Sequence, residues 1–321
     1  MKKQYVISSD LDYSQSISPA AGPVYAERMG WPVLSFDEAF GSEFEILCSE
    51  GWTVVDNRLS ERECEILTAS IEANPEMPFV LKAIDPYYEW CRDHWYYRML
   101  FAVARRPNVY FLSPYVPAEV VADLDRASGG DRLVVVPYAY PADVEQPAGG
   151  GRKQQVIFSG NQLRTVYPFR YQFDRIATWW PPLGRHVDVL EHPGYPDIGE
   201  EQKHEQIGAR YIEHLARYAF MFVSPSRCRL EFLKYGECAA AGCVPIGVLP
   251  RGFPADATEA FVQLDFDNVF RLERSTRRAI QTPADEIEAR ARAYRDAMRS
   301  RRSASVLNEQ LDAFLASASA A

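Results

Sequence analysis

The sequence has no apolar run long enough to cross a membrane, no paired cysteine spacing and no surplus of basic residues. No stretch reaches the ~18 uninterrupted apolar residues that a transmembrane helix needs. The first residues, MKKQYVISSDLDYS, turn polar too early for a secretory signal peptide. We therefore expect a cytoplasmic protein without a transmembrane segment.

The cysteines and the net charge exclude further classes. The six cysteines are scattered without CxxC spacing, most of them in apolar contexts, so neither disulfides nor a zinc site is expected. The formal net charge is −9. A general nucleic-acid-binding protein needs lysine and arginine to displace counterions from phosphates, so we expect no nucleic-acid partner.

The chain is long enough for two domains that each bury a core. Its 321 residues are 47% hydrophobic and 25% charged, which are ordinary values for a folded globular protein. Short β-rich runs alternate with helical ones, and this alternation predicts mostly parallel sheets with helices on both faces. The expected strands are 4–8, 53–56, 79–82, 109–112, 133–137, 155–160, 186–190, 219–224, 244–249 and 261–264.

A Pro- and Gly-rich stretch, YPADVEQPAGGGRK (140–153), interrupts the pattern and predicts a linker. We therefore predict an α/β protein with two Rossmann-like domains facing across a cleft. The first domain covers 1–145 and the second 150–282. Residues 283–321 are expected to form a C-terminal helix that fades into a frayed end.

Several helix boundaries carry local signals. Ser60 with Glu63 three residues later predicts a capping box, and the run from Asp85 to Ala104 predicts one aromatic-rich helix. In the second domain, Pro168 is expected in the first turn of a helix. Ser226 is expected to cap a helix that ends at Gly242.

Ligands bind at the carboxyl ends of the strands in such folds, so the strand-to-helix loops are the candidate sites. The loop FSGNQLRTVYPFR (158–170) lies in a zone where six arginines and lysines between residues 150 and 186 face one acid. Gly160 allows close approach of a ligand to the backbone, and Arg164 and Arg170 suit phosphate oxygens. Its Ser159 and Asn161 are further candidate ligands. This loop is neither a P-loop nor a G-x-G-x-x-G fingerprint, and a surface loop with solvated arginines remains the alternative.

The segment RCRLEFLKYGECAAAGCVPIGVLP (227–250) supplies a second group of charges. The predicted helix carries Arg229, Glu231 and Lys234 in its first two turns and Glu237 in its middle. At ~100° per residue, Arg229 and Glu237 lie about 80° apart, so the two can share one ligand. Ser224 ends the preceding predicted strand, Ser226 is the expected cap, and both join the candidate binding residues. A core amphipathic helix with solvated charges is the alternative.

The run RLEFLKYGECAAAGCVPIGVLP resembles the donor-binding segment of nucleotide-sugar glycosyltransferases with the two-domain GT-B fold. Its form is similar to the exostosin-like and group-1-like branches, which also tend to have a YP-x-R segment like that at 167–170. The resemblance covers about residues 155–250 and implies that Glu237 holds the ribose. Many retaining members have a second glutamate eight residues earlier. Arg229 stands there in this chain, so the retaining mechanism is not implied.

The resemblance implies transfer of a sugar from a nucleoside diphosphate sugar to an acceptor hydroxyl. That chemistry requires stabilisation of the charge that grows on the departing diphosphate, and arginines such as Arg229 can supply it without a metal or a cofactor. The triplet Asp10-Leu11-Asp12 is more simply a polar loop than a metal site. The general base is expected from the first domain, where Asp10, Asp12, Asp93 and His94 are candidates.

Two other hypotheses on the function remain compatible with the sequence. One is a non-catalytic protein that binds a nucleotide or sugar nucleotide with the same fold. The other is an assembly subunit that uses the Trp- and Tyr-rich first domain as a contact surface. The sugar, the nucleotide base, the acceptor and the oligomeric state are not determined by these patterns.

Overall fold

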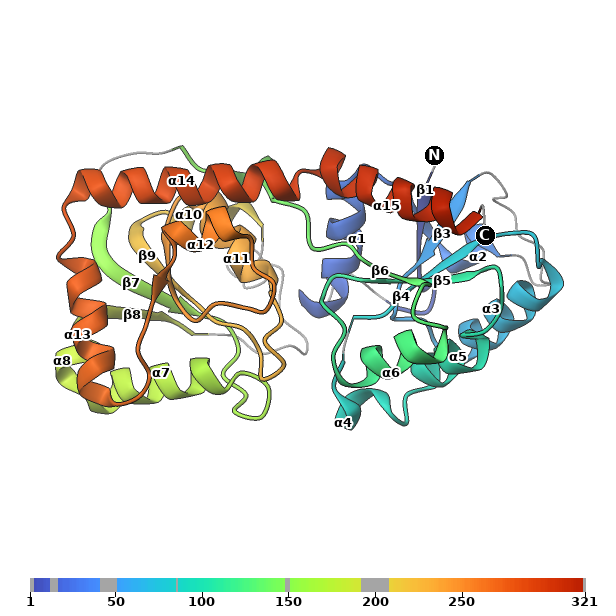
Figure 1. The fold of residues 1–321 in the computed structure, drawn as a ribbon, viewed down its shortest axis with the longest axis horizontal. Helices are drawn as coiled ribbons and strands as arrows, with labels where there is room; N and C mark the ends of the chain where they lie inside the picture. The colour runs from blue at the N-terminus through green and yellow to red at the C-terminus, as the bar shows by residue number, and fades with distance from the viewer. Residues whose placement is uncertain are drawn as a thin grey trace. The chain divides into compact units, whose positions relative to one another are not determined.

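The computed structural model describes residues 3–11, 17–40, 51–84, 86–147, 151–191 and 208–319. The chain divides into two units (Figure 1). Unit 1 consists of Met1–Ala139 together with Ala304–Ala321, and unit 2 consists of Tyr140–Ser303. The segment predicted as a C-terminal helix with a tail thus contributes to both units.

Unit 1 is built on a six-stranded sheet in which every paired strand is parallel. The strand order is β2 (Val33–Ser35), β1 (Lys3–Ile7), β3 (Trp52–Val55), β4 (Phe79–Lys82), β5 (Val109–Ser113), β6 (Leu133–Val135). Apolar side chains on both faces of the four inner strands, β1, β3, β4 and β5, are buried, whereas the edge strands β2 and β6 are half-buried. Burial on both faces is the pattern of a sheet covered by helices on both sides.

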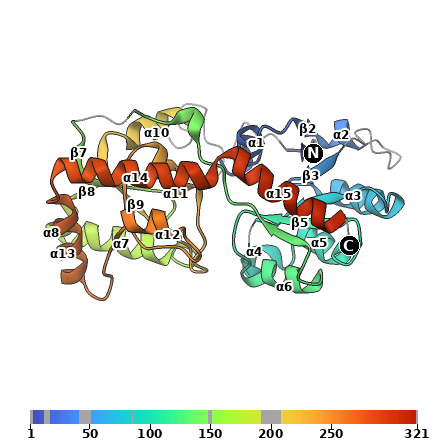
Figure 2. The same cartoon turned by 45° about the horizontal axis from the view of Figure 1, so that its top comes forward.

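Two helix layers cover this sheet. On one face, α1 (Ile17–Met29) and α15 (Ala304–Ser319) pack side by side, as Figure 2 shows. The other face is covered by α2 (Phe36–Ala39), α3 (Glu61–Ala73), α5 (Trp95–Val103) and α6 (Glu119–Ala127). The short helix α4 (Tyr88–Cys91) lies beside α6.

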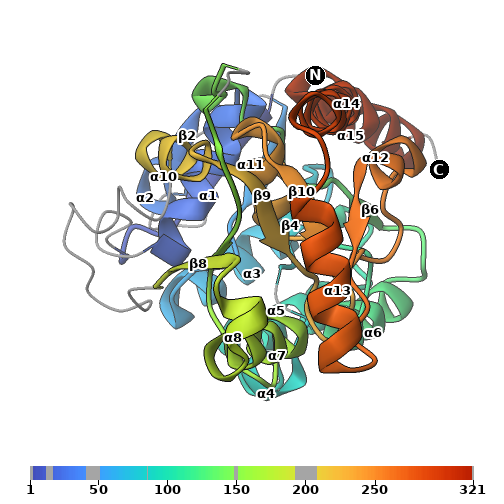
Figure 3. The same ribbon diagram turned by 90° about the vertical axis from the view of Figure 1, so that its left-hand side faces the viewer.

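Unit 2 repeats the plan with five parallel strands. Their order is β11 (Val262–Gln263), β10 (Val244–Gly247), β9 (Tyr218–Val223), β7 (Lys153–Ser159), β8 (Val187–Leu190). One face carries α10 (Ala209–Leu215), α11 (Leu233–Ala240), α12 (Ala255–Ala260) and α14 (Ala284–Arg302). The other carries α7 (Pro168–Trp179), α8 (Pro181–Gly184) and α13 (Val269–Ile280), and both layers are visible in Figure 3.

Local sequence signals placed several helix ends correctly. Ser60 accepts from the backbone N–H of Glu63 and the Glu63 side chain returns to the Ser60 N–H, which confirms the capping box. Pro168 is the first residue of α7. Gly242 ends α11 at φ +67°, with hydrogen bonds from Gly242 N to Ala239 O and from Cys243 N to Cys238 O. These two bonds form a Schellman motif.

Two predicted helices were wrong in extent. The aromatic run after Asp85 breaks into α4 and α5, because His94 caps α5 by accepting from Tyr96 N at 3.2 Å. The helix expected from Ser226 begins only at Leu233, with Phe232 as its N-cap. Strand β2 and the short 3-10 turn at Ala142–Val144 were not predicted, and helix α1 carries a proline, Pro23, that weakens its signal.

None of the helices in the described ranges is both long and apolar enough to span a membrane.

Candidate functional site

The chain reverses its winding direction in unit 2 between β7 and β9. From β7 it runs to β8 on one side and then returns to place β9 on the other side of β7. The carboxyl ends of two such strands form the crevice in which open α/β sheets bind ligands. The loops after β7 and after β9 therefore define the candidate site, and both had been singled out from the sequence.

The two loops are tied to each other. Arg227 in the loop after β9 donates its backbone N–H to Val166 O at 2.8 Å and its guanidinium to Thr165 O at 3.2 Å. Ser226 is fully buried, and its Oγ accepts from Cys228 N at 3.2 Å. These bonds hold the two loops in one fixed arrangement over the ends of β7 and β9.

Arg170 lies at the centre of this arrangement. It comes from the first turn of α7, is only 4% exposed, and its guanidinium carbon lies 4.5 Å from the centre of the Tyr167 ring and 5.8 Å from that of Phe232. Gly160 follows β7 at φ +104°, and a Cβ there would lie 3.0 Å from Arg170 Nη1. The glycine thus leaves room for the guanidinium beside the backbone. No acidic side chain in the described part of the chain forms an ion pair with Arg170.

A chain of polar contacts connects β7, α10 and α11. Ser159 Oγ lies 2.6 Å from the Tyr211 hydroxyl, and Lys234 Nζ donates to the same hydroxyl at 2.6 Å. Lys234 also forms an ion pair with Glu237 Oε2 at 3.3 Å, one helical turn away. Burial lowers the pKa of Lys234, but Glu237 and Tyr211 outweigh it, so the pKa lies above its usual value of 10.5. Lys234 is therefore a cation at neutral pH.

Two buried oxygen atoms of the site have no hydrogen-bond partner within the described residues. These are Ser224 Oγ at the end of β9 and Glu237 Oε2 on α11, whose contact with Lys234 is an ion pair and not a hydrogen bond. Buried polar atoms are nearly always hydrogen-bonded in folded proteins, so each unsatisfied atom requires an explanation. A ligand whose hydroxyl or amide N–H groups donate hydrogen bonds to these two oxygens would explain them.

Arg229 and Glu231 do not lie on the helix, contrary to the prediction. Arg229 adopts a left-handed conformation at φ +61°, which ends a turn closed by Arg229 N to Ser226 O at 2.9 Å. Its exposed side chain stacks on Phe169. Glu231 pairs with Arg302 of α14 at 2.8 Å. The helical geometry that related Arg229 to Glu237 is therefore wrong.

The remaining loop residues take different positions. Asn161 accepts from Leu163 N at 2.8 Å through its side chain, which shapes the turn after Gly160. Arg164 is exposed and stacks on Tyr171, so it lies on the surface and not among the buried side chains around Arg170.

The candidate residues of unit 1 have structural partners. His94 caps α5, and burial together with Arg58 and Arg98 lowers its pKa. Asp93 is exposed and accepts from Arg98 through its backbone carbonyl. Asp10 accepts from Ser60 Oγ at 2.6 Å, and Asp12 lies outside the described residues.

Within the described ranges, no three His, Cys, Asp or Glu side chains gather as a metal site would require. The prediction of a metal-independent reaction stays a prediction.

Sequence reasoning did not assign Lys234 and Tyr211 to the site. The i,i+3 spacing of Lys234 and Glu237 was a usable signal, because such pairs lie on one helix face. No local pattern marked Tyr211, which reaches the site from α10 only through the tertiary fold.

No family model and no curated protein matches the sequence, whereas solved structures do match. A UDP-forming alpha,alpha-trehalose-phosphate synthase from Burkholderia xenovorans matches with a TM-score of 0.55 and 14% identity over 84% of this chain and 74% of that chain. An E. coli structure described as trehalose-6-phosphate bound with UDP-2-fluoro glucose matches with a TM-score of 0.55 and 10% identity over 99% of both chains. A trehalose-6-phosphate synthase matches with a TM-score of 0.57 and 11% identity over 98% of both chains.

These similarities confirm the predicted fold class. The chain has the GT-B fold, which consists of two Rossmann-like α/β domains. At 10–14% identity they establish the fold and no activity.

Proposed function

We propose that the protein is a glycosyltransferase that moves a sugar from a nucleoside diphosphate sugar to an acceptor hydroxyl without a metal ion. Unit 2 binds the donor, unit 1 provides the acceptor side, and the enzyme acts in the cytoplasm. The observation that carries the proposal is a group of buried polar side chains at the switch point of unit 2. It combines Arg170, which has no acid partner in the described ranges, with Ser224 Oγ and Glu237 Oε2, which accept no hydrogen bond there although Glu237 is ion-paired with Lys234.

The roles of these residues follow from their chemistry. Glu237 accepts hydrogen bonds from the ribose hydroxyls, since a carboxylate oxygen without a hydrogen bond suits a diol. Arg170 binds the diphosphate and stabilises the charge that develops when it departs. Lys234 holds the Glu237 carboxylate in place through their ion pair. The Gly-Cys-Val-Pro turn after α11 supports an exostosin-like subtype.

Uridine diphosphate is the first nucleotide to test, because the solved structures of similar fold include a UDP-forming synthase. In a thermal-shift experiment, UDP, GDP and their sugars are compared. A ligand at 100 times its Kd adds about 2.7 kcal/mol to the unfolding free energy. Absence of a shift with every nucleotide at millimolar concentration would remove the proposal.

Glu237→Gln tests the site itself. The variant loses the ionised carboxylate but keeps its size, so the Kd for the nucleotide should rise about tenfold to a hundredfold. Glu259→Gln, on the exposed face of α12, is the matched control and should bind as the wild type. If Glu237→Gln lowers the melting temperature strongly and leaves the affinity intact, Glu237 has only a structural role.

A non-catalytic nucleotide-binding protein is the second candidate. It is favoured by Arg229 in place of the second glutamate and by the structural engagement of His94 as a helix cap. Release of UDP from a bound UDP-sugar separates the two functions. An enzyme releases the diphosphate at a rate that Arg170→Met lowers by about tenfold or more, whereas a binding protein returns the sugar nucleotide intact.

A further inference from the structure

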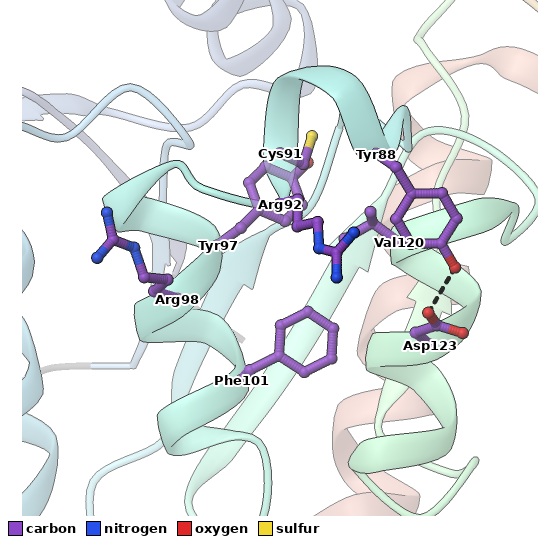
Figure 4. Close-up of a pocket in the computed structure, with 8 residues that line it drawn as sticks. All are labelled: Tyr88, Cys91, Arg92, Tyr97, Arg98, Phe101, Val120 and Asp123. Carbon is purple, nitrogen blue, oxygen red and sulfur yellow. Dashed lines mark hydrogen bonds between the residues drawn. The ribbon is translucent and has the colours of Figure 1, made fainter.

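Unit 1 contains a hollow of about 730 Å³ between helices α4, α5 and α6, shown in Figure 4. This volume lies within the range of pockets that hold small organic ligands. Its lining residues are Tyr88, Cys91, Arg92, Tyr97, Arg98, Phe101, Val120 and Asp123. None of them belongs to the candidate site of unit 2.

The hollow has a buried floor and exposed aromatic walls. Cys91, Tyr97 and Val120 are at most 5% exposed and form the floor. The rings of Tyr88 and Phe101 stand on different sides of the hollow and are 43% and 40% exposed. Large aromatic rings left in water around a hollow mark a binding surface, because a ligand that covers them removes apolar area from water.

One wall is held rigidly. The Tyr88 hydroxyl donates to Asp123 Oδ2 at 2.5 Å, and the Tyr88 backbone N–H donates to Glu119 Oε2 at 3.2 Å. Asp123 also pairs with Arg126. The ring is therefore placed before a ligand arrives, which reduces the entropy that binding must overcome.

The free charge in the hollow is positive. Figure 4 shows the Arg92 guanidinium between the rings of Phe101 and Tyr88, whereas Arg98 points away. No acid in the described part of the chain forms an ion pair with Arg92. The carboxylate of Asp123 is already engaged by Tyr88 and Arg126. An anionic group of a ligand is the natural partner of Arg92.

We propose that this hollow binds an acidic saccharide. A sugar ring packs its C–H face on Phe101 and Tyr88, and a carboxylate substituent, as in a uronic acid, pairs with Arg92. The faces of pyranose rings carry C–H groups that pack on aromatic rings, and their hydroxyl groups bond to the polar rim. This site does not depend on the function proposed for unit 2, because binding is measured without a sugar nucleotide.

The test measures binding of a trigalacturonate and of neutral cellotriose to the full-length protein by isothermal titration calorimetry. The trigalacturonate should bind with a Kd at least about tenfold lower than that of cellotriose, since only it has carboxylates for Arg92. Arg92→Gln should remove that preference. Phe101→Ala should raise the Kd for both ligands by about tenfold.

Matched controls are Arg105→Gln, an exposed arginine of unit 1 outside the hollow, and Phe270→Ala, a 62% exposed ring in unit 2. Both should bind trigalacturonate as the wild type does. If the wild type does not bind trigalacturonate at concentrations up to about 10 mM, the proposal is overturned. Unchanged affinity in Arg92→Gln and Phe101→Ala also overturns it.

Two further outcomes would assign the hollow to another partner. Competition by UDP for the trigalacturonate would make it a nucleotide site, and a dimer that Phe101→Ala dissociates would make it a protein contact. Both would overturn the saccharide proposal. The thermal shift with UDP, measured on the same variants, reports separately on unit 2, so failure of one proposal is distinguishable from failure of the other.

Discussion

Arg170 is a buried cation that lies against Tyr167 and Phe232, with no acid partner in the described ranges. Taking a charge out of water without a partner destabilises a protein. A residue of this kind is expected where binding an anion compensates for the cost, and active sites commonly trade stability for function in this way. The exposed Arg164 has no such cost, although both arginines were given the same role from the sequence.

We expect Arg170→Met to keep the melting temperature of the ligand-free protein or to raise it, because the variant retains the packing and removes the charge. Binding of the nucleoside diphosphate should weaken by about tenfold or more, since a charge-assisted contact is worth ~1.5–3 kcal/mol. Arg164→Ala should change binding by less than about threefold. Calorimetry with UDP checks both. Equal losses in the two variants would contradict the separate roles of the buried and the exposed arginine.

Substitutions of His94 can distinguish its two candidate roles, general base and helix cap. Asparagine also caps helices, so His94→Asn should keep the stability of the protein, whereas His94→Ala should lose about 1 kcal/mol. If His94→Asn loses turnover while it keeps its stability, the imidazole has a chemical role. Full turnover in His94→Asn would leave only the cap.

The pH dependence of stability follows from the lowered pKa of His94, caused first by burial and then by Arg58 and Arg98. A lowered pKa means that the folded state binds the proton less tightly than the unfolded state. The contribution to stability is therefore present above the usual pKa of 6.5 and is lost as the pH falls through the lowered value. Wild type should lose unfolding free energy on acidification relative to His94→Asn, which urea denaturation at pH 7.5 and pH 5 measures.

At the scale of elements, α11 depends on how its C-terminus is held. Arg152 donates to Gly242 O, and Arg295 donates to Ala239 O at 3.1 Å. Two cations at the carbonyl end of a helix stabilise its dipole and satisfy carbonyl groups that the helix leaves free. Part of the basic zone noted in the sequence therefore holds the helix that carries Glu237, rather than binding a phosphate.

Gly242→Ala should be among the most destabilising changes in unit 2. A Cβ there would contact Arg295 and would lie 2.8 Å from Arg152, in addition to the strain of φ +67°. We expect a loss of about 3 kcal/mol or more. Gly130→Ala is the control, because Gly130 has φ +83° with no atom within 4 Å of the added Cβ, so it should lose only ~1–2 kcal/mol. Similar losses at the two positions would show that strain alone, and not the arginine pair, sets the cost.

At the scale of the whole molecule, the chain leaves unit 1 after Ala139 and returns to it at Ala304. Helix α15 buries Leu307, Leu311 and Leu315 completely against unit 1, beside α1. Helix α15 is thus part of the core of the first unit, although it follows 164 residues of the second. The core of unit 1 is complete only when α15 has been made and has docked.

Leu311→Ala should destabilise unit 1 by about 2–5 kcal/mol through the cavity it creates. Hydrogen exchange should accelerate in β1, β3 and β4, and less in β7 and β9, because each unit has a core of its own. Gln310→Ala, exposed on the same helix, should leave exchange unchanged. Equal acceleration in both units would show that they unfold together.

Sequence alone determined those features that depend on neighbouring residues. The capping box at Ser60, the start of α7 at Pro168 and the end of α11 at Gly242 depend on contacts within about six positions. The alternation of strands and helices likewise fixed the parallel α/β class, because each element had to bury an apolar face. The loops of the candidate site followed from these elements, since ligands bind at the carboxyl edge of such sheets.

Only the tertiary structure decided where the charges near α11 point. Glu231 leaves the helix and pairs with Arg302, which is 71 positions away. Tyr211 comes from another helix to meet Lys234, and Arg170 becomes buried while Arg164 stays exposed. Local propensity carries no information on such contacts, because their energy comes from groups that only the folded chain brings together. The aromatic walls of the hollow in unit 1 follow the same rule, since two of its three helices arise where His94 interrupts a single helical pattern.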